Sequence, residues 1–248
     1  MKKIFYKPKS LKNIPFKYCP GCGHSIAHRL IAEVIDKLKI QEITIGVAPV
    51  GCAVFAYNYF DIDMLEIPHG RPPAAATGMK RSCPEKIIFT YQGDGDLAAI
   101  GTAEIIHAAN RGENITVFFI NNANYGMTGG QMAPTTLISQ KTTTTPYGRD
   151  PQTTGYPLHV SELIALLEGT AFVARGSLDN YKNIVMTKKY IEQAFRYQIE
   201  NKGFSFVEIL SPCPTDWEMS PEKALYWLRE NMIKEYKLGV IKDKWNKE

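Results

Sequence analysis

The sequence lacks the long apolar run that a membrane-spanning helix requires. No stretch approaches the roughly 20 consecutive apolar residues that cross a bilayer. The first residues, MKKIFYKPKSLKN, carry positive charge, but no apolar segment or small-residue cleavage site of a secretion signal follows them. We therefore expect neither a membrane protein nor an exported one, and the sequence predicts a cytoplasmic location.

A strong excess of charge and an internal repeat are also absent. The formal net charge is +4 and the basic residues are scattered, so the sequence does not predict a nucleic-acid partner. No second copy of any segment is visible. A length of 248 residues with 44% hydrophobic residues suits one α/β domain with a sizeable core. We predict a single domain that comprises residues 1–248.

A glycine turn, Gly93-Asp94-Gly95, lies between two periodic segments. Residues 87–91 are typical of a buried parallel strand, and the segment from about Leu97 to Asn110 is typical of an amphipathic helix. Glycines let an anion approach the backbone, and the helix N-terminus carries partial positive charge. Because a lone aspartate there would repel a phosphate, Asp94 predicts a metal ion between the two.

Asparagines follow the next predicted strand, at Asn121 and Asn122 after residues 114–120. Adjacent parallel strands bring their carboxyl ends together, so Asp94 and an asparagine oxygen can share one ion. Carboxylate, amide and carbonyl oxygens suit Mg²⁺. A Gly-Asp-Gly tripeptide alone is often a surface turn, but the strand-turn-helix-strand context favours a diphosphate site.

The sequence has five cysteines and no secretion signal, which favours metal or redox chemistry over disulfides. Cys19 and Cys22 form a C-x-x-C pair in the turn-rich stretch FKYCPGCGH. A thioredoxin-like dithiol is disfavoured because no core strand precedes the pair, so zinc and iron–sulfur both stay open. Cys52 follows a predicted strand, residues 42–48, in another glycine turn. We expect this turn and the Asp94 turn to border one crevice.

Two loops remain. His69-Gly70-Arg71 follows a short predicted strand, and the sequence alone favours a helix-capping loop there, ahead of Pro72. The segment from Asn121 to His159 is rich in Thr, Gly, Pro and Asn, and a loop of this length in a compact domain is usually functional or disordered. We predict a functional loop, in which Lys141 and Arg149 face an acidic substrate or solvent.

After this loop, helices and strands alternate again. The segments 163–167, 183–201 and 221–237 are predicted helices, and the segments 171–175 and 205–210 are predicted strands.

The motif Gly-Asp-Gly, followed by 26 residues and the second asparagine of the pair, is similar to the thiamine diphosphate motif. The stretch NYGMTGGQ narrows this to the β subunits of 2-oxoacid:ferredoxin oxidoreductases, which the chain resembles over nearly its whole length. The resemblance implies a doubly wound α/β fold with a mostly parallel sheet, of the diphosphate-binding type. It also implies an N-terminal C-x-x-C knuckle, a C-terminal helical tail, and three cofactors: thiamine diphosphate, Mg²⁺ and a 4Fe-4S cluster.

The resemblance also implies the ligands of each group. Thiamine diphosphate is expected against Val50, Gly51, Cys52, Ala53, His69, Gly95, Asp96, Gly126 and Met127. Asp94, Asn122 and Asn124 are the expected Mg²⁺ ligands, and Cys19, Cys22, Cys52 and Cys213 the expected cluster ligands. Cys83 matches none of these positions, and we expect it to be a buried structural thiol.

The implied reaction is the coenzyme A-dependent oxidative decarboxylation of a 2-oxoacid, with reduction of ferredoxin, as in anaerobic metabolism. The activating glutamate is expected on a partner subunit of the α or γ type, so this chain should supply no catalytic side chain and be inactive alone. The overall similarity favours 2-oxoglutarate or 3-methyl-2-oxobutanoate as substrate.

Two alternatives stay open. A cluster-free thiamine diphosphate lyase or synthase would leave four cysteines idle. A non-catalytic binding subunit would use them to hold zinc.

Overall fold

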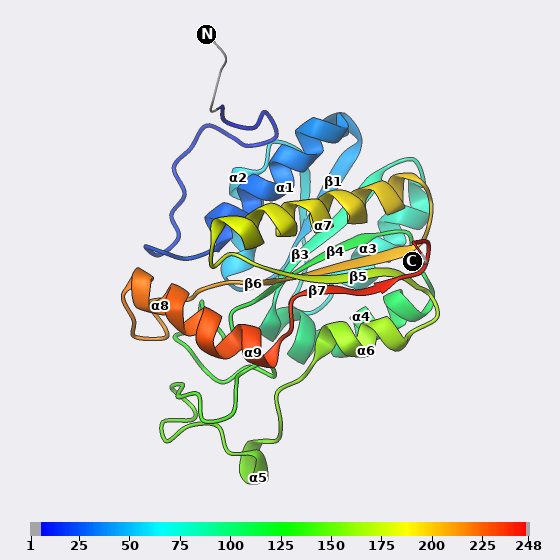
Figure 1. Cartoon of the computed structure of the whole chain (residues 1–248). Helices are drawn as coiled ribbons and strands as arrows, with labels where there is room; N and C mark the ends of the chain where they lie inside the picture. The colour runs from blue at the N-terminus through cyan, green and yellow to red at the C-terminus, as the bar shows by residue number, and fades with distance from the viewer. Residues whose placement is uncertain (1–5, 247–248) are drawn as a thin grey trace.

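The structure is a computed structural model that describes residues 6–246. Within these residues a seven-stranded sheet in the order β2-β1-β3-β4-β6-β5-β7 forms the centre, with helices on both faces (Figure 1). The neighbouring strands are parallel except for β5 and β7, which are antiparallel. This confirms the doubly wound, mostly parallel α/β fold.

The central strands are apolar because helices cover both of their faces. All six residues of β4 are buried, and so are all seven of β6. The strands are β1 (Thr44–Ala48), β2 (Asp63–Glu66), β3 (Ile87–Gly93), β4 (Thr116–Asn121), β5 (Thr170–Ser177), β6 (Phe204–Leu210) and β7 (Gly239–Asp243).

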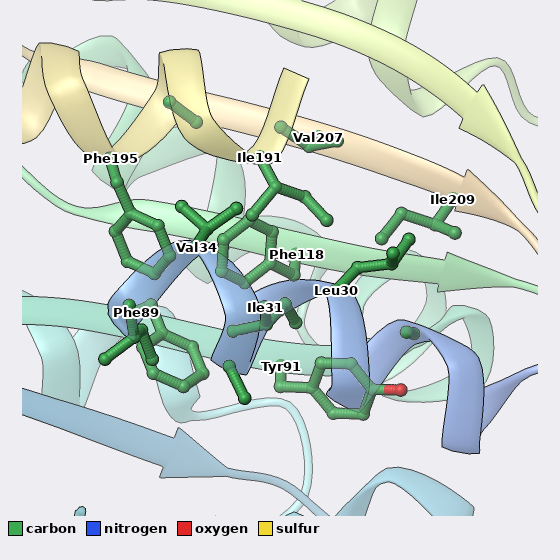
Figure 2. Close-up of a cluster of buried hydrophobic side chains, with 14 of the residues drawn as sticks. Leu30, Ile31, Val34, Phe89, Tyr91, Phe118, Ile191, Phe195, Val207 and Ile209 are labelled. Atoms are coloured by element: carbon green, nitrogen blue, oxygen red, sulfur yellow. The ribbon is translucent and has the colours of Figure 1, made fainter. Parts of the chain in front are cut away.

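Helices α1 (His24–Leu38) and α7 (Tyr181–Ile199) cover one face of the sheet. Figure 2 shows how Val34 of α1 and Phe195 of α7 lie over aromatic side chains of the strands. Phe195 meets Phe89 edge to face, with ring centroids 5.9 Å apart. On the other face α3 (Pro72–Ser82), α4 (Thr102–Asn110) and α6 (Val160–Leu166) pack through small and branched residues.

Short helical segments complete the fold and refine the predicted boundaries. The helix expected from Leu97 begins earlier, as a π-helical turn, η3. The tail expected as one helix is broken by another π turn, η4, and the edge strand β7 was not predicted. The segments are η1 (Gln41–Ile43), η2 (Cys52–Phe55), α2 (Ala56–Tyr59), η3 (Gly95–Ile100), α5 (Pro151–Thr154), α8 (Pro221–Trp227), η4 (Leu228–Met232) and α9 (Ile233–Glu235).

None of the helices within residues 6–246 has the length and apolar character needed to cross a membrane.

The long segment after β4 forms an arm, residues 132–158, that stands away from the sheet (Figure 1). Arg149 holds this arm together. Its side chain is buried, and its guanidinium donates hydrogen bonds to the main-chain oxygens of Pro134, Thr136, Thr154, Gly155 and Tyr156, at 2.5 to 3.3 Å. A guanidinium has five N–H donors, and all are used here. The expectation that Arg149 faces substrate or solvent is therefore wrong, whereas Lys141 is exposed.

Candidate cofactor and metal site

The carboxyl ends of β1, β3 and β4 lie side by side, and the loops that follow them surround a cavity of about 130 Å³. Each residue that the sequence assigned to thiamine diphosphate or Mg²⁺ lines this cavity: Val50, Gly51, Cys52, Ala53, His69, Asp94, Gly95, Asp96, Asn122, Asn124, Gly126 and Met127. The structure thus brings together residues that are distant in the sequence.

Oxygen atoms of Asp94, Asn122 and Asn124 converge at one point of the cavity wall. The end of the Asn122 amide lies 3.2 Å from both carboxylate oxygens of Asp94 and 2.8 Å from the main-chain oxygen of Asn124. Adjacent oxygens of an octahedron with Mg–O bonds of 2.0–2.1 Å are about 2.9 Å apart. With its oxygen turned inward, Asn122 therefore completes a ligand set that fits Mg²⁺. Rotated by half a turn, the amide instead donates hydrogen bonds to the same oxygens.

Asp94 is buried at the start of η3 and is held by three donors. It accepts hydrogen bonds from the main-chain N–H of Gly95 (2.9 Å) and of Asn124 (3.1 Å), and from the hydroxyl of Thr135 (2.8 Å). Burial raises the pKa of Asp94 to about 7, against the effect of these hydrogen bonds. A cation beside the carboxylate would offset this cost of burying a charge. Sequence reasoning missed Thr135, because it belongs to no motif.

The asparagine turn is supported from behind. Ala123 has a φ of +58°, which is unusual for a residue other than glycine. The side chain of Asn121 accepts a hydrogen bond from the Ala123 N–H (3.1 Å) and donates one to Glu208 (2.7 Å). Glu208 in turn pairs with Arg175 at 2.7 Å, and both are fully buried. This chain of contacts fixes the turn that carries Asn122 and Asn124.

The His69 loop has both of the features considered for it. Arg71 precedes the first residue of α3 and Pro72 begins it, so the loop caps a helix. Its histidine nevertheless lines the cavity, where Nδ1 lies 2.5 Å from the carboxylate of Asp96.

Two glycines permit close packing around the cavity. A Cβ on Gly95 would lie 2.2 Å from the ring of Tyr125, so a larger residue would displace that ring. A Cβ on Gly126 would lie 3.3 Å from the sulfur of Cys52. The NYGMTGG stretch therefore lies directly against both the Gly-Asp-Gly turn and the Cys52 turn.

The four cysteines assigned to the cluster come from three places and lie near one another. Cys19 and Cys22 form a turn before α1, with the Cys22 N–H donating to the Cys19 carbonyl (3.0 Å). Cys52 begins η2, and Cys213 follows β6. Burial raises the pKa of Cys22 to about 11 and of Cys52 to about 12, and the thiols of this group add to the rise through their mutual interactions.

All five cysteines are free thiols. Among the residues that the structure describes, no three His, Cys, Asp or Glu side chains converge on one ion. Cys83, at the end of α3, is only half-buried, so the expectation of a buried thiol is wrong.

Asp216 and His24 border the site and were also missed. The carboxylate of Asp216 lies 3.2 Å from the sulfur of Cys213. His24 lines the cavity, and its Nδ1 lies 2.7 Å from the hydroxyl of Tyr91. The spacing Cys-x-x-Asp in CPTD and the histidine of CPGCGH were visible in the sequence, but neither spacing indicates a function by itself.

The family described as "Thiamine pyrophosphate enzyme, C-terminal TPP binding domain" matches residues 49–209. The ketoisovalerate oxidoreductase subunit VorA of Methanothermobacter thermautotrophicus is 48% identical over 98% of this chain and 53% of its own length. The chain thus spans about half the length of that relative. The 2-oxoglutarate synthase subunit KorB of Methanocaldococcus jannaschii is 37% identical over 89% of this chain and 79% of its own.

A solved structure shares the fold. It is that of the 2-oxoglutarate:ferredoxin oxidoreductase from Magnetococcus marinus with 2-oxoglutarate, coenzyme A and succinyl-CoA bound. The likeness has a TM-score of 0.78 at 24% identity, and covers 99% of this chain and 88% of the other. From its domain match and its relatives, this chain belongs to the family of thiamine pyrophosphate-binding β subunits of the 2-oxoacid:ferredoxin oxidoreductases.

Proposed function

We propose that this chain is the β subunit of a 2-oxoacid:ferredoxin oxidoreductase, and that it holds thiamine diphosphate, Mg²⁺ and a 4Fe-4S cluster. The observation that carries the proposal is the position of Cys52. Its turn lines the same cavity as the carboxylate of Asp94, and its thiol belongs to the group of four cysteines. One turn therefore connects a cofactor site with a redox site.

The protein's own part in the diphosphate site is to bind and orient. Asp94, Asn122 and Asn124 would hold Mg²⁺ between the protein and the diphosphate, at the N-terminus of η3. The chemistry that thiamine diphosphate supplies when bound is nucleophilic attack on a keto carbon and storage of the electron pair left by decarboxylation.

The four cysteines favour an iron–sulfur cluster over zinc. A tetrahedral zinc ion needs three or four ligands that converge on one point, and the described His, Cys, Asp and Glu residues form no such group. A cluster with four irons distributes its thiolate ligands over four metals, so the thiols need not converge. A cluster-free lyase would have no use for this group of four thiols, of which Cys52 lines the cavity.

The edge of the cavity, where Val50 and Met127 are exposed, favours a substrate with an apolar side chain. The described residues that line it include no Lys or Arg, and Met127 and Val50 are among them. Arg149 is fully occupied in the arm, and Lys141 lines a separate hollow beside Trp217. We therefore favour 3-methyl-2-oxobutanoate, while 2-oxoglutarate would need a base from another subunit for its second carboxylate.

The remaining parts come from partners. We assign the activating glutamate to a partner subunit of the α or γ type, and coenzyme A and ferredoxin are the co-substrate and the electron acceptor. The 2-oxoglutarate and coenzyme A bound in the solved structure belong to that protein, and they support a 2-oxoacid and coenzyme A as the substrates here. The chain itself acts as one domain in a cytoplasmic complex.

The test is an anaerobic preparation of the complex, analysed for metal and for activity. We expect about four irons and four sulfides per chain, a visible absorption band, and coenzyme A-dependent reduction of a viologen dye with 3-methyl-2-oxobutanoate in preference to 2-oxoglutarate and pyruvate. Cys52→Ser should lower the iron content, and Cys83→Ser serves as the matched control that keeps it. Zinc in place of iron in a colourless protein would contradict the proposal.

A further inference from the structure

Asp96 is the second acidic residue of the Gly-Asp-Gly-Asp stretch, and its side chain is directed at the protein. Its carboxylate accepts three hydrogen bonds: from Nδ1 of His69 (2.5 Å), from the Gly70 N–H (2.8 Å) and from Nε2 of Gln92 (2.6 Å). The side chain of Asp96 is 1% exposed, whereas that of His69 is 30% exposed. The histidine can therefore meet a ligand in the cavity, and the carboxylate cannot.

The backbone fixes the distance between these two residues. The π turn η3 places Asp96 toward the His69 loop, and its end is closed by the Gly101 N–H donating to the Asp96 carbonyl (2.8 Å). The loop packs directly on this end, because a Cβ on Gly70 would lie 2.7 Å from the Gly101 nitrogen. Single π turns inside helices occur frequently at functional sites.

The third donor belongs to β3. Gln92 reaches Asp96 with its amide nitrogen, while its own side-chain oxygen is buried without a hydrogen-bond partner. Asp96 is thus tied to a strand, a loop and a helix at once. Such a carboxylate fixes the ring to which it is bonded, in the way that an acidic partner orients a histidine in other binding sites.

We propose that Asp96 is a positioning residue of the diphosphate site: its carboxylate accepts from Nδ1–H of the His69 ring and so aims Nε2–H of the imidazolium, which donates from both nitrogens, at the anion. This assignment rests on the proposed function, since the anion is the diphosphate of the cofactor. Asp96 itself makes no contact with the ligand through its side chain. A free carboxylate at this point would repel the diphosphate. The three hydrogen bonds that the Asp96 carboxylate accepts offset its negative charge.

Two substitutions separate the orientation of His69 from the charge behind it. Asp96→Ala removes the acceptor and the charge. Asp96→Asn keeps an acceptor for His69 and Gly70, and its NH₂ group can donate to the Gln92 side-chain oxygen once that amide rotates, because this oxygen is unpartnered. Asp96→Asn therefore preserves the fold of the site and is the variant to use where Asp96→Ala does not fold.

The experiment measures thiamine diphosphate affinity of the intact complex by calorimetry with Mg²⁺ present. We expect Asp96→Ala and His69→Gln each to weaken binding about tenfold, and the double variant to be no weaker than His69→Gln. Asp96→Asn should retain more affinity than Asp96→Ala, and Asp61→Ala, at an exposed aspartate, should bind as wild type. Losses that simply add in the double variant would overturn the proposal.

A second readout requires no ligand. In the chain labelled at histidine, the ¹⁵N shifts of the His69 ring should move on Asp96→Ala, and those of the exposed His107 should not. Unmoved His69 signals would overturn the proposal. A wild-type complex that binds no thiamine diphosphate would overturn both the proposed function and the role of Asp96. If the wild-type complex binds the cofactor and the Asp96→Ala complex binds it equally well, only the role of Asp96 is overturned.

Discussion

Asp216 places a carboxylate among the thiols of the proposed cluster. It lies 3.2 Å from the Cys213 sulfur, and it contributes to raising the pKa of Cys22, Cys52 and Cys213. Negative charge beside a cluster disfavours the addition of an electron. We therefore expect Asp216→Asn to raise the reduction potential of the cluster by roughly 40 mV, which equals about 1 kcal/mol for one electron.

A redox titration followed by electron paramagnetic resonance measures this shift. Glu218→Gln is the matched control, because Glu218 is exposed and lies two residues further along the chain. An unchanged potential in Asp216→Asn with full iron content would show that the carboxylate does not act on the cluster.

At the scale of single residues, the sequence predicts the site residues that belong to motifs. It misses the site residues that reach the cavity or the cysteines only in the folded chain. Asp94, Asn122 and Cys52 follow predicted strands, so their meeting at one rim could be inferred. Thr135 reaches Asp94 through long-range packing that leaves no spacing pattern. Asp216 lies three residues after Cys213, a visible spacing that indicates no function by itself. Arg149 was misjudged because its charge suggests a surface, while its five acceptors are all main-chain oxygens that no sequence shows.

Helix α1 buries two histidines on its apolar face. Burial lowers the pKa of His28 well below its ordinary value, with a smaller effect from His24, and Nε2 of His28 lies 2.8 Å from the Tyr18 hydroxyl. The unfolded chain binds a proton at His28 near pH 6.5 and the folded chain does not. Between that pH and the lowered pKa, the contribution of His28 to stability should thus fall as pH falls, by up to about 1.4 kcal/mol per pH unit. The raised pKa of Asp94 acts in the opposite direction, so the comparison is between variants.

Urea unfolding at a series of pH values from 7 to 5 measures this slope. His28→Gln should remove only the His28 share, because burial also lowers the pKa of His24, to about 4. His107→Gln, at an exposed position of α4, should leave the slope unchanged. An identical slope in wild type and His28→Gln would contradict the account.

The arm of residues 132–158 depends on one side chain. Arg149→Lys replaces five fixed donors by three and leaves buried main-chain oxygens without partners. We expect a loss of about 3 kcal/mol in unfolding free energy, and faster hydrogen exchange in the arm but not in the sheet. Arg81→Lys is the control, since the Arg81 side chain is 63% exposed. Unchanged hydrogen exchange of the arm in Arg149→Lys would show that the arm does not depend on Arg149.

Elements with strong local patterns were predictable, and those set by tertiary contacts were not. The buried runs of β3, β4 and β6 identify parallel strands. Strand β7 is short and half-buried, so its pattern is weak, and it forms by pairing with β5. The π turn of η3 could not be foreseen, because the contact of Gly101 with Gly70 constrains it.

The whole molecule presents an arm with exposed aromatic side chains. Tyr147 is 98% exposed and Tyr156 is 76% exposed, and both lie on the arm that Arg149 holds.

We expect the isolated chain to show no decarboxylation, and the assembled complex to show it, because the activating glutamate is assigned to a partner. Size-exclusion chromatography combined with the viologen assay tests this expectation, and turnover by the chain alone would disprove it.

The order of the cysteines along the chain has a consequence for biosynthesis. Three of the four clustered thiols precede β3, and the fourth, Cys213, follows β6. A growing chain therefore displays three thiols long before the last one leaves the ribosome, and a chain that stops before Cys213 never acquires it. For the proposed cluster, a translation product that breaks off before β6 would therefore lack the fourth ligand.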